Sequence, residues 1–210
     1  MKTTRTPLIL AIGVLAAGIS SANGQNLISN ASFEDPPLPT PNTYVFELPT
    51  DWNQNLDANS LPIIFNGTIP GWPSPEQGNQ LLDIGNSSGN SAGVNQTFTV
   101  TVPGTYDLTW YDNAEIGEPH TYSVSLGGTT VDFTNGVGST TWTEHELSVV
   151  LSGSATLTFD PILGGVDTLL DNVQLQPAQA SVPDGAGTFG LLNLALGGMA
   201  VLARRLRRHH

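Results

Sequence analysis

The sequence predicts an all-β fold, an antiparallel two-sheet jelly-roll sandwich, and three observations lead to it. No stretch between residues 23 and 180 keeps a helical apolar period over three turns. Short runs there alternate apolar and polar residues, and Gly, Pro, Asn, Ser and Thr recur between them. Several such strands at regular spacing favour two packed sheets over one open sheet.

The expected strands follow one another along the chain with turn residues between several of them. In order they are residues 26–34, 69–72, 80–84, 94–102, 105–111, 121–126, 129–133, 146–151, 155–159 and 168–176. Pro103 with Gly104, and Gly127 with Gly128, are expected to form turns. Long loops are expected around residues 36–41, where prolines lack donors for a sheet interior, and around 51–60.

Period two assigns one face of each strand to the core. The predicted core faces are Val94, Gln96, Phe98, Val100 and Val102; Tyr106, Leu108 and Trp110; Tyr122, Val124 and Leu126; Leu147, Val149 and Leu151; Ala155, Leu157 and Phe159; and Leu169, Asp171, Val173 and Leu175. Thr and Ser fill most of the opposite positions, which is the pattern of sheets with one packed and one wet face.

Positive charge is confined to the two ends of the chain. The six Lys and Arg lie within residues 2–5 and 204–208, whereas all eighteen Asp and Glu lie between them. The stretch between residues 6 and 203 therefore has a formal charge of -18 with His neutral. Such a surface repels phosphate backbones, which excludes nucleic acid as a partner. A carboxylate buried in this stretch has no Lys or Arg to pair with, which makes calcium the natural cofactor to suspect.

Residues 1–22 have the parts of a secretory signal peptide, which is expected to be helical and to be removed after residue 22. Lys2 and Arg5 precede an apolar run, residues 7–19, and small residues follow at 20–22. The alternative is a retained membrane anchor. It is disfavoured because the run is shorter than the ~20 residues that a span needs.

The other end, residues 189–210, predicts a short C-terminal transmembrane helix. Its apolar run, residues 189–203, is followed by a basic cluster of Arg204, Arg205, Arg207 and Arg208. The run alone reaches about 22 Å as a helix, less than the ~30 Å hydrocarbon core, but extension to Leu206 with snorkelling arginines makes a span feasible. The positive-inside rule then leaves the arginines in the cytoplasm and the domain outside.

Residues 178–188 are interpreted as a linker and sorting motif. Val182, Pro183 and Asp184 stand before the apolar run and the basic cluster, and this three-part tail resembles the PEP-CTERM sorting signal in its Val-Pro-Asp variant. The resemblance implies an exosortase-type membrane protease or transpeptidase that cuts near the motif and delivers the domain to the cell surface, outer envelope or extracellular matrix. A plain C-terminal membrane anchor without processing is the alternative.

Residues 23–177 form the predicted sandwich domain. The runs NLISNASFE, IPGW, NQLLDIG, VNQTFTVTVPGTYDLTWYDN, SVSLGGTTVDF, WTEHELSVVLSGSATLTF and LLDNVQL occur in that order. Together they resemble the galactose-binding-like jelly-roll family, in particular bacterial surface proteins that share a domain with plant cell-wall proteins of unknown function. Carbohydrate-binding modules are more distant relatives in that resemblance, which implies an extracellular polysaccharide as a possible partner.

Glu34 and Asp171 are the predicted metal ligands. Asp171 stands in an apolar row of the last strand, where a cation would compensate its charge. The family resemblance implies a structural calcium held by an acid after the first strand and another in the last, which are Glu34 and Asp171. The alternative is that Asp171 accepts hydrogen bonds from loop amides, without a metal.

Trp52, Tyr111 and Trp142 are the predicted ligand-binding aromatics. Tyr111 and Trp142 share strand parity with polar residues, and Trp52 falls in a predicted loop, so all three are expected to be exposed for stacking on sugar rings. Trp110 has core parity and Trp72 is expected to cap the sandwich.

No catalytic residues are predicted, and the protein is expected not to be an enzyme. Glu144, His145 and Glu146 are adjacent, but neighbours on a strand point to opposite faces. The sequence therefore predicts an exported, exosortase-sorted surface or matrix protein with a carbohydrate-binding-like sandwich. A structural biofilm or envelope protein without a ligand is the alternative, and a secreted glycoside hydrolase, which needs two carboxylates across a cleft, is a third.

Overall fold

The structure is a computed structural model that describes residues 24–55, 60–86, 90–162 and 168–179. Strands, turns and loops make up these residues, without a helix, and all pairs of strands are antiparallel, which confirms the predicted class. The strands are β1 (Thr43–Phe46), β2 (Asn53–Gln54), β3 (Ile63–Asn66), β4 (Gln80–Asp83), β5 (Gly85–Asn86), β6 (Asn90–Ser91), β7 (Val94–Asn113), β8 (Pro119–Leu126), β9 (Thr129–Val137), β10 (Thr143–Pro161) and β11 (Leu169–Pro177).

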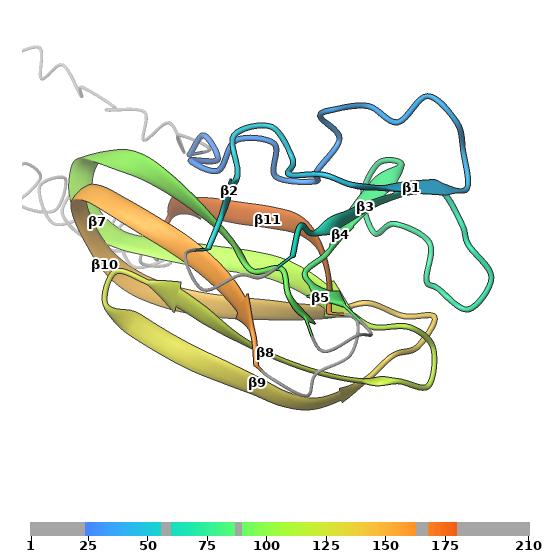
Figure 1. Ribbon diagram of the computed structural model, residues 1–210. Coiled ribbons are helices and arrows are strands. Elements are labelled where there is room, and N and C mark those ends of the chain that lie inside the picture. Colours follow the sequence, from blue (N-terminus) through green and yellow to red (C-terminus); the bar gives the residue numbers. More distant parts are fainter. Residues whose placement is uncertain (1–23, 56–59, 87–89, 163–167, 180–210) are drawn as a thin grey trace, which may run out of the picture.

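One continuous sheet, folded over on itself, makes both layers of the sandwich (Figure 1). Its order is β1-β3-β4-β11-β7-β10-β8-β9, with β2 paired to the start of β7; β5 and β6 form a separate hairpin. The second half of β7 pairs with β11, and the second half of β10 pairs with β8. β7 and β10, of 20 and 19 residues, therefore run through both layers, and they bend together at the left of Figure 1.

β7 and β10 each replace two of the expected strands, and the bend lies where the first of each two was expected to end. Pro103 and Gly104 were expected to form a turn, but β7 continues through them and pairs with β10 on both sides. The register of the pair shifts between Leu151 and Gly153, and Gly153 has a φ of 65°. A bulge of this kind increases the twist of a strand and lets it cross from one layer to the other.

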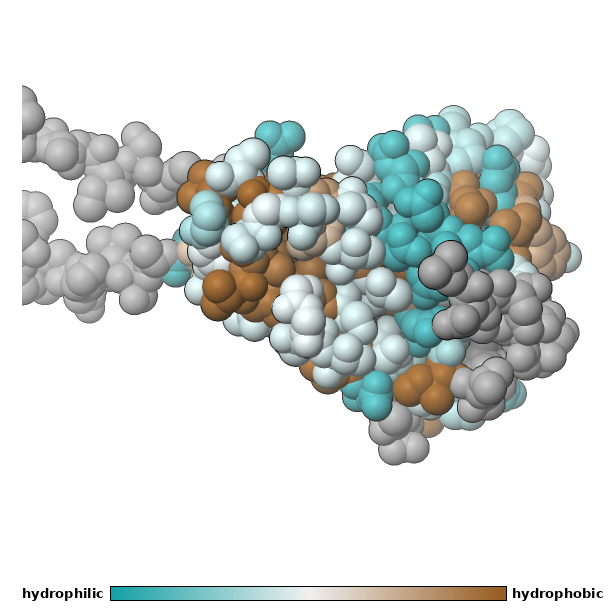
Figure 2. Space-filling view, turned by 60° about the vertical axis from the view of Figure 1, so that its left-hand side comes forward, coloured by the Kyte–Doolittle hydropathy of each residue, from teal (hydrophilic) through white to brown (hydrophobic). Residues whose placement is uncertain are grey.

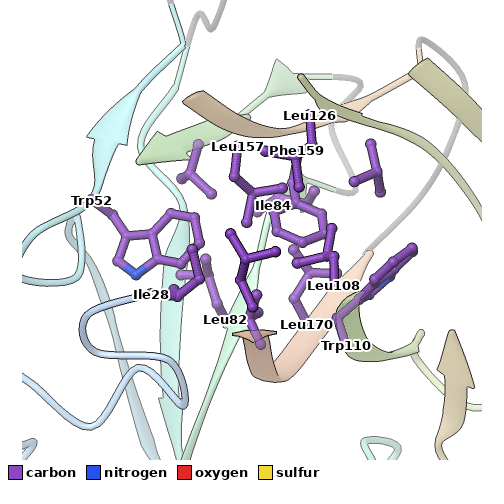
Figure 3. Close-up of a cluster of buried hydrophobic side chains, with 14 of the residues drawn as sticks. Ile28, Trp52, Leu82, Ile84, Leu108, Trp110, Leu126, Leu157, Phe159 and Leu170 are labelled. Carbon is purple, nitrogen blue, oxygen red and sulfur yellow. The ribbon is translucent and has the colours of Figure 1, made fainter. Parts of the chain in front are cut away.

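The core lies between the two layers and contains the predicted apolar faces of β7, β8 and β10 (Figure 3). Leu108, Trp110, Val124, Leu157 and Phe159 are fully buried. Val102 was predicted to share this face but is 69% exposed, because it lies at the bend of β7.

The last strand also departs from simple alternation. Leu169, Asp171, Val173 and Leu175 were predicted to share one face, but Leu169 packs in a separate small cluster, whereas Val173 and Leu175 lie in the main core. The register with β7 shifts between Asp171 and Gln174, and Asn172 has a φ of 48°. This bulge reverses the parity, so Leu169 and Asp171 face the outside of the layer.

The first half of the described chain agrees less well with the expected strands. Residues 26–34 form turns instead of a strand, and Asn30 and Phe33 adopt positive φ values of 47° and 57° that a strand does not use. Residues 69–72 are also a turn. The expected strand at 80–84 is confirmed by β4, whereas β1, β2 and β3 were not predicted.

Both predicted end segments lie outside the described residues. This applies to the signal peptide at 1–22, the sorting motif at 182–184, and the anchor with its arginines at 189–210. Within the part that is described, no helix is long and apolar enough to cross a membrane. Figure 2 shows one face of the molecule, where pale side chains of intermediate hydropathy alternate with smaller hydrophilic and hydrophobic areas.

Candidate functional site

A second, small hydrophobic cluster lies on the outer face of β3, β4 and β11. Phe65, Leu81 and Leu169 form its buried part, and Trp72 and Trp142 pack against it from loops and strand ends. The segment between β3 and β4, residues 67–79, covers this face with few regular backbone bonds. The cluster anchors both tryptophans beside the outward-facing side of β7.

A groove of about 580 Å³ opens between the 67–79 segment and the strands. Its walls combine aromatic rings with prolines, hydroxyls and a single carboxylate. The lining residues are Thr68, Trp72, Pro73, Ser74, Pro75, Glu76, Tyr111, Thr140, Thr141 and Trp142. Trp72, Tyr111 and Trp142 are each half-buried, so each ring has one supported part and one accessible part.

Each aromatic ring of this groove is held in place by a specific contact. Trp142 donates a hydrogen bond from Nε1 to the main-chain oxygen of Ser74, 2.8 Å away. Trp72 stacks on Phe65, with ring centroids 4.5 Å apart and planes at 29°. Tyr111 lies opposite Glu144 in the β7–β10 pair, and desolvation and this carboxylate raise the pKa of its phenol. Rings fixed in advance lose little freedom when a ligand binds.

Glu34 and Asp171 both bind the backbone of the segment that forms one wall of the groove. Asp171 Oδ2 accepts hydrogen bonds from the amides of Glu76 and Gln77, at 2.8 and 2.9 Å. Glu34 Oε1 accepts hydrogen bonds from the amides of Asn79 and Gln80, both at 2.7 Å. The two predicted metal ligands therefore act on neighbouring turns of one loop, and the loop-amide alternative describes the observed contacts of Asp171.

The Asp171 carboxylate lacks a positive partner in this arrangement. It is fully buried, and burial raises its pKa to about 7 even though three backbone amides donate to it. No cluster of three or more His, Asp or Glu with the geometry to hold a metal occurs among the described residues. A cation here would need loop carbonyls and water to complete the 6–8 oxygen ligands that calcium prefers.

Trp52 is a correction to the sequence prediction. It is only 4% exposed, so it has no face available for a ligand. Its Nε1 donates to the main-chain oxygen of Asn30, and its ring lies 5.4 Å from that of Phe33. The cause is β2, which pairs with the start of β7 directly after Trp52 and draws the side chain into the core.

The structure places Tyr111 and Trp142, two of the predicted ligand-binding aromatics, in one groove with Trp72 and Glu76, which were not assigned to a ligand from the sequence. Trp72 was expected to cap the sandwich; it does pack on Phe65, but its accessible part lines the groove. The signal available in the sequence was a tryptophan in a proline-rich stretch, IPGWPSPE, which cannot pair as an inner strand.

A second polar site, formed by residues of β7, β8 and β10 on their inner side, was not predicted. Asp112 Oδ2 accepts hydrogen bonds from Tyr122 Oη at 2.8 Å and His120 Nε2 at 3.1 Å, and His145 Nε2 lies 2.9 Å away. Burial by itself would raise the pKa of Asp112, but its contacts with His120, His145 and Tyr122 outweigh burial and lower this pKa to about 2. The Asp112 carboxylate is therefore ionised at neutral pH.

Comparison with known proteins gives likeness in structure only. No protein-family model matches the sequence, and no curated protein matches it. An apo cyclase from Fischerella sp. is 17% identical with a TM-score of 0.57, covering 74% of this chain and 97% of its own. The stig cyclase Fisc from Fischerella sp. TAU, in complex with (3Z)-3-(1-methyl-2-pyrrolidinylidene)-3H-indole, is 16% identical with a TM-score of 0.56, covering 73% and 98%.

A third structure, the carbohydrate-binding module TmCBM61 in complex with β-1,4-galactotriose, is 17% identical over 73% of this chain and 99% of its own. Its TM-score is 0.49, too low to bear on the argument. At the identities of the two cyclases the likeness concerns the fold alone. It shows that this antiparallel sandwich is a known fold, and function has to be argued from the groove.

Proposed function

We propose that the protein is an exported cell-surface or extracellular-matrix protein whose sandwich binds a polysaccharide in the groove of Trp72, Tyr111 and Trp142. The observation that carries this proposal is the convergence of three half-buried aromatic rings on one groove of about 580 Å³. The flat apolar face of an aromatic ring matches the C–H face of a pyranose, and these rings are fixed before binding.

The polar residues of the groove suit hydroxyl-rich ligands. Thr68 and Ser74 present hydroxyls that are 2.9 Å apart, and Glu76 accepts a hydrogen bond from Asn172 at 2.8 Å. The groove has no Lys or Arg, and the domain is strongly acidic. Acidic polysaccharides would be repelled, so the proposed ligand is a neutral one.

Binding is favoured over hydrolysis because the groove has one carboxylate. Hydrolysis of a glycosidic bond generally needs two carboxyl groups on either side of the scissile bond. Of the groove residues only Glu76 is acidic. The related surface role, a structural matrix component without a ligand, stays the alternative that a binding experiment decides.

We further propose that calcium stabilises the wall of the groove at Glu34 and Asp171. The support is the buried carboxyl group of Asp171, which has amide donors but no positive partner, and the two neighbouring turns that these acids bind. Calcium bound there would supply positive charge, while Glu34 and Asp171 would hold the 76–80 turns in place.

The proposed route to the surface depends on the sequence of the two ends. A signal peptide at residues 1–22 would start export, and the Val182–Asp184 motif with the helix and arginines of 189–210 would hold the chain in the membrane until an exosortase-type enzyme processes it. The support is the confinement of all Lys and Arg to the two ends of the chain. By the positive-inside rule, each basic end then stays on the cytoplasmic side and the domain between them lies outside.

A glycan array tests the binding proposal. The full-length protein is applied to immobilised neutral and acidic polysaccharides at moderate salt, next to a Trp142→Ala variant. The proposal expects signals on neutral glycans that the variant loses. An array without any signal for the wild-type protein would reject binding and leave the structural role.

A further inference from the structure

A second cavity, of about 220 Å³, lies at the end of the sandwich where β7 ends and β10 begins. Buried Asp112 and His120 line it, together with His145, Phe133 and Val137. Val137 is 63% exposed and marks the opening. Thr141 lines both this cavity and the aromatic groove, which otherwise share no residue.

This cavity is lined by a cluster of polar residues that a contribution to stability does not explain. An ionised carboxylate and two imidazoles come from three strands, β7, β8 and β10, and meet beside the ring of Trp110, which stacks on His145 with centroids 5.3 Å apart. Buried charge clusters are often no more stabilising than apolar residues of the same volume. Binding of a ligand would account for this cluster, which packing of the core does not require.

Two imidazole nitrogens in the cavity are buried without a hydrogen-bond partner in the protein. These are His120 Nδ1 and His145 Nε2, the second lying near Asp112 but not aligned for a hydrogen bond. Leaving such a group unsatisfied destabilises the fold, so stability alone does not account for the cluster.

The charge and shape of the cavity restrict what it can bind. Asp112 is negative and the domain has no Lys or Arg, which disfavours phosphates and carboxylates. The ring of Phe133 and the side chain of Val137 give one apolar wall, whereas Thr141 and Thr143 add hydroxyls. The volume equals about seven waters at ~30 Å³ each, which suits one small ring and not an oligosaccharide.

We propose that this cavity is a second ligand site, which takes a single neutral, hydroxyl-rich unit such as one sugar ring. The C–H face of the ring packs on Phe133 and Val137. Gly136 makes this geometry possible, because a Cβ at that position would lie 1.9 Å from the His120 ring. The site does not depend on binding in the aromatic groove.

Histidine signals give a direct test, because the chain has only four His, of which two line the cavity. The full-length protein, isotope-labelled at His, is titrated with galactose, glucose, mannose and inositol, one at a time. The expected result is a saturable shift of the His120 and His145 ring signals by at least one of them, with a Kd on the order of millimolar.

Two variants locate the binding. Val137→Trp should fill the opening without touching the polar cluster, and it should weaken binding about tenfold or more while the ligand-free ring signals stay in place. Trp142→Ala, in the aromatic groove, should leave the shifts unchanged, which separates this site from the proposed polysaccharide site. Equal shifts in the Val137→Trp variant would overturn the proposal.

Two further outcomes would also overturn it. If no compound of the panel moves either ring signal, the cavity has no sugar site. If the ring signals respond to ammonium or zinc ions and not to any sugar, the cavity is a cation site.

Discussion

Trp142 Nε1 lies 2.8 Å from the main-chain oxygen of Ser74 and donates a hydrogen bond to it, which joins the residue before β10 to the loop on the opposite side of the groove. The first prediction follows from this contact. Trp142→Ala should weaken polysaccharide binding by about 2 kcal/mol, roughly thirtyfold, because it removes a preorganised ring. Isothermal titration calorimetry measures it. Phe46→Ala, an exposed aromatic outside the groove, is the control and should bind as the wild type does.

Trp52 should matter for stability and not for binding. Trp52→Ala removes a buried ring that touches Phe33 and Phe159, so unfolding in urea should need about 3–5 kcal/mol less free energy. The folded fraction should bind glycans with unchanged affinity. A stable Trp52→Ala protein that no longer binds would return Trp52 to the ligand site.

Acid stability should depend on Asp112. Its folded pKa, about 2, is lower than its ordinary value of 3.8, so the ionised form stabilises the fold above pH 3.8 and this contribution is lost as the pH falls through about 2. The stability difference between wild type and Asp112→Asn should therefore shrink by about 2 kcal/mol from about pH 5 to about pH 2. Urea unfolding across this range measures it; a difference that does not vary with pH would contradict the assignment.

Calcium should raise the melting temperature of the wild-type protein, and a chelator should lower it. A ligand at 100 times its Kd adds about 2.7 kcal/mol to the free energy of unfolding. Glu34→Gln and Asp171→Asn should lose this response, whereas Asp132→Asn, an exposed acid on β9, should keep it. Differential scanning calorimetry with and without chelator decides, and an unchanged wild-type melting temperature rejects the calcium site.

The C-terminal segment should determine where the protein is found. A chain that ends before Phe189 should appear in the culture medium, because it lacks the predicted anchor and the arginines. Replacing Val182, Pro183 and Asp184 with alanine should leave an uncleaved, membrane-bound chain. Immunoblots of medium and membrane fractions distinguish these results. Retention of the truncated chain would reject the anchor.

Alternation predicted the strands of the second half of the domain, because each buries one face in a large core. Trp110, Val124 and Phe159 lie in that core as expected. Bulges were not predictable from alternation, because one extra residue in a strand moves the residues before it to the opposite faces. Asn172 shows this: it places Asp171 on the outer side, beside the loop of Glu76, and not in the core row.

The candidate sites depended on contacts between distant segments, which limited what the sequence could predict. Parity placed Tyr111 and Trp142 on the outer face, but Trp72 joins them only because its loop folds over Phe65. In the same way, Asp112 and His120 each follow a core alternation, and a polar residue at such a position is a signal for a buried cluster. Their pairing across β7 and β8 required the structure.

The most direct measurement of the central claim is a crystal structure of the protein with an oligosaccharide of the polysaccharide that it binds. The account predicts sugar rings in the groove, with one ring stacked on Trp142 and another group contacting Tyr111 or Trp72. Sugar bound elsewhere on the sandwich, with the groove empty, would contradict it.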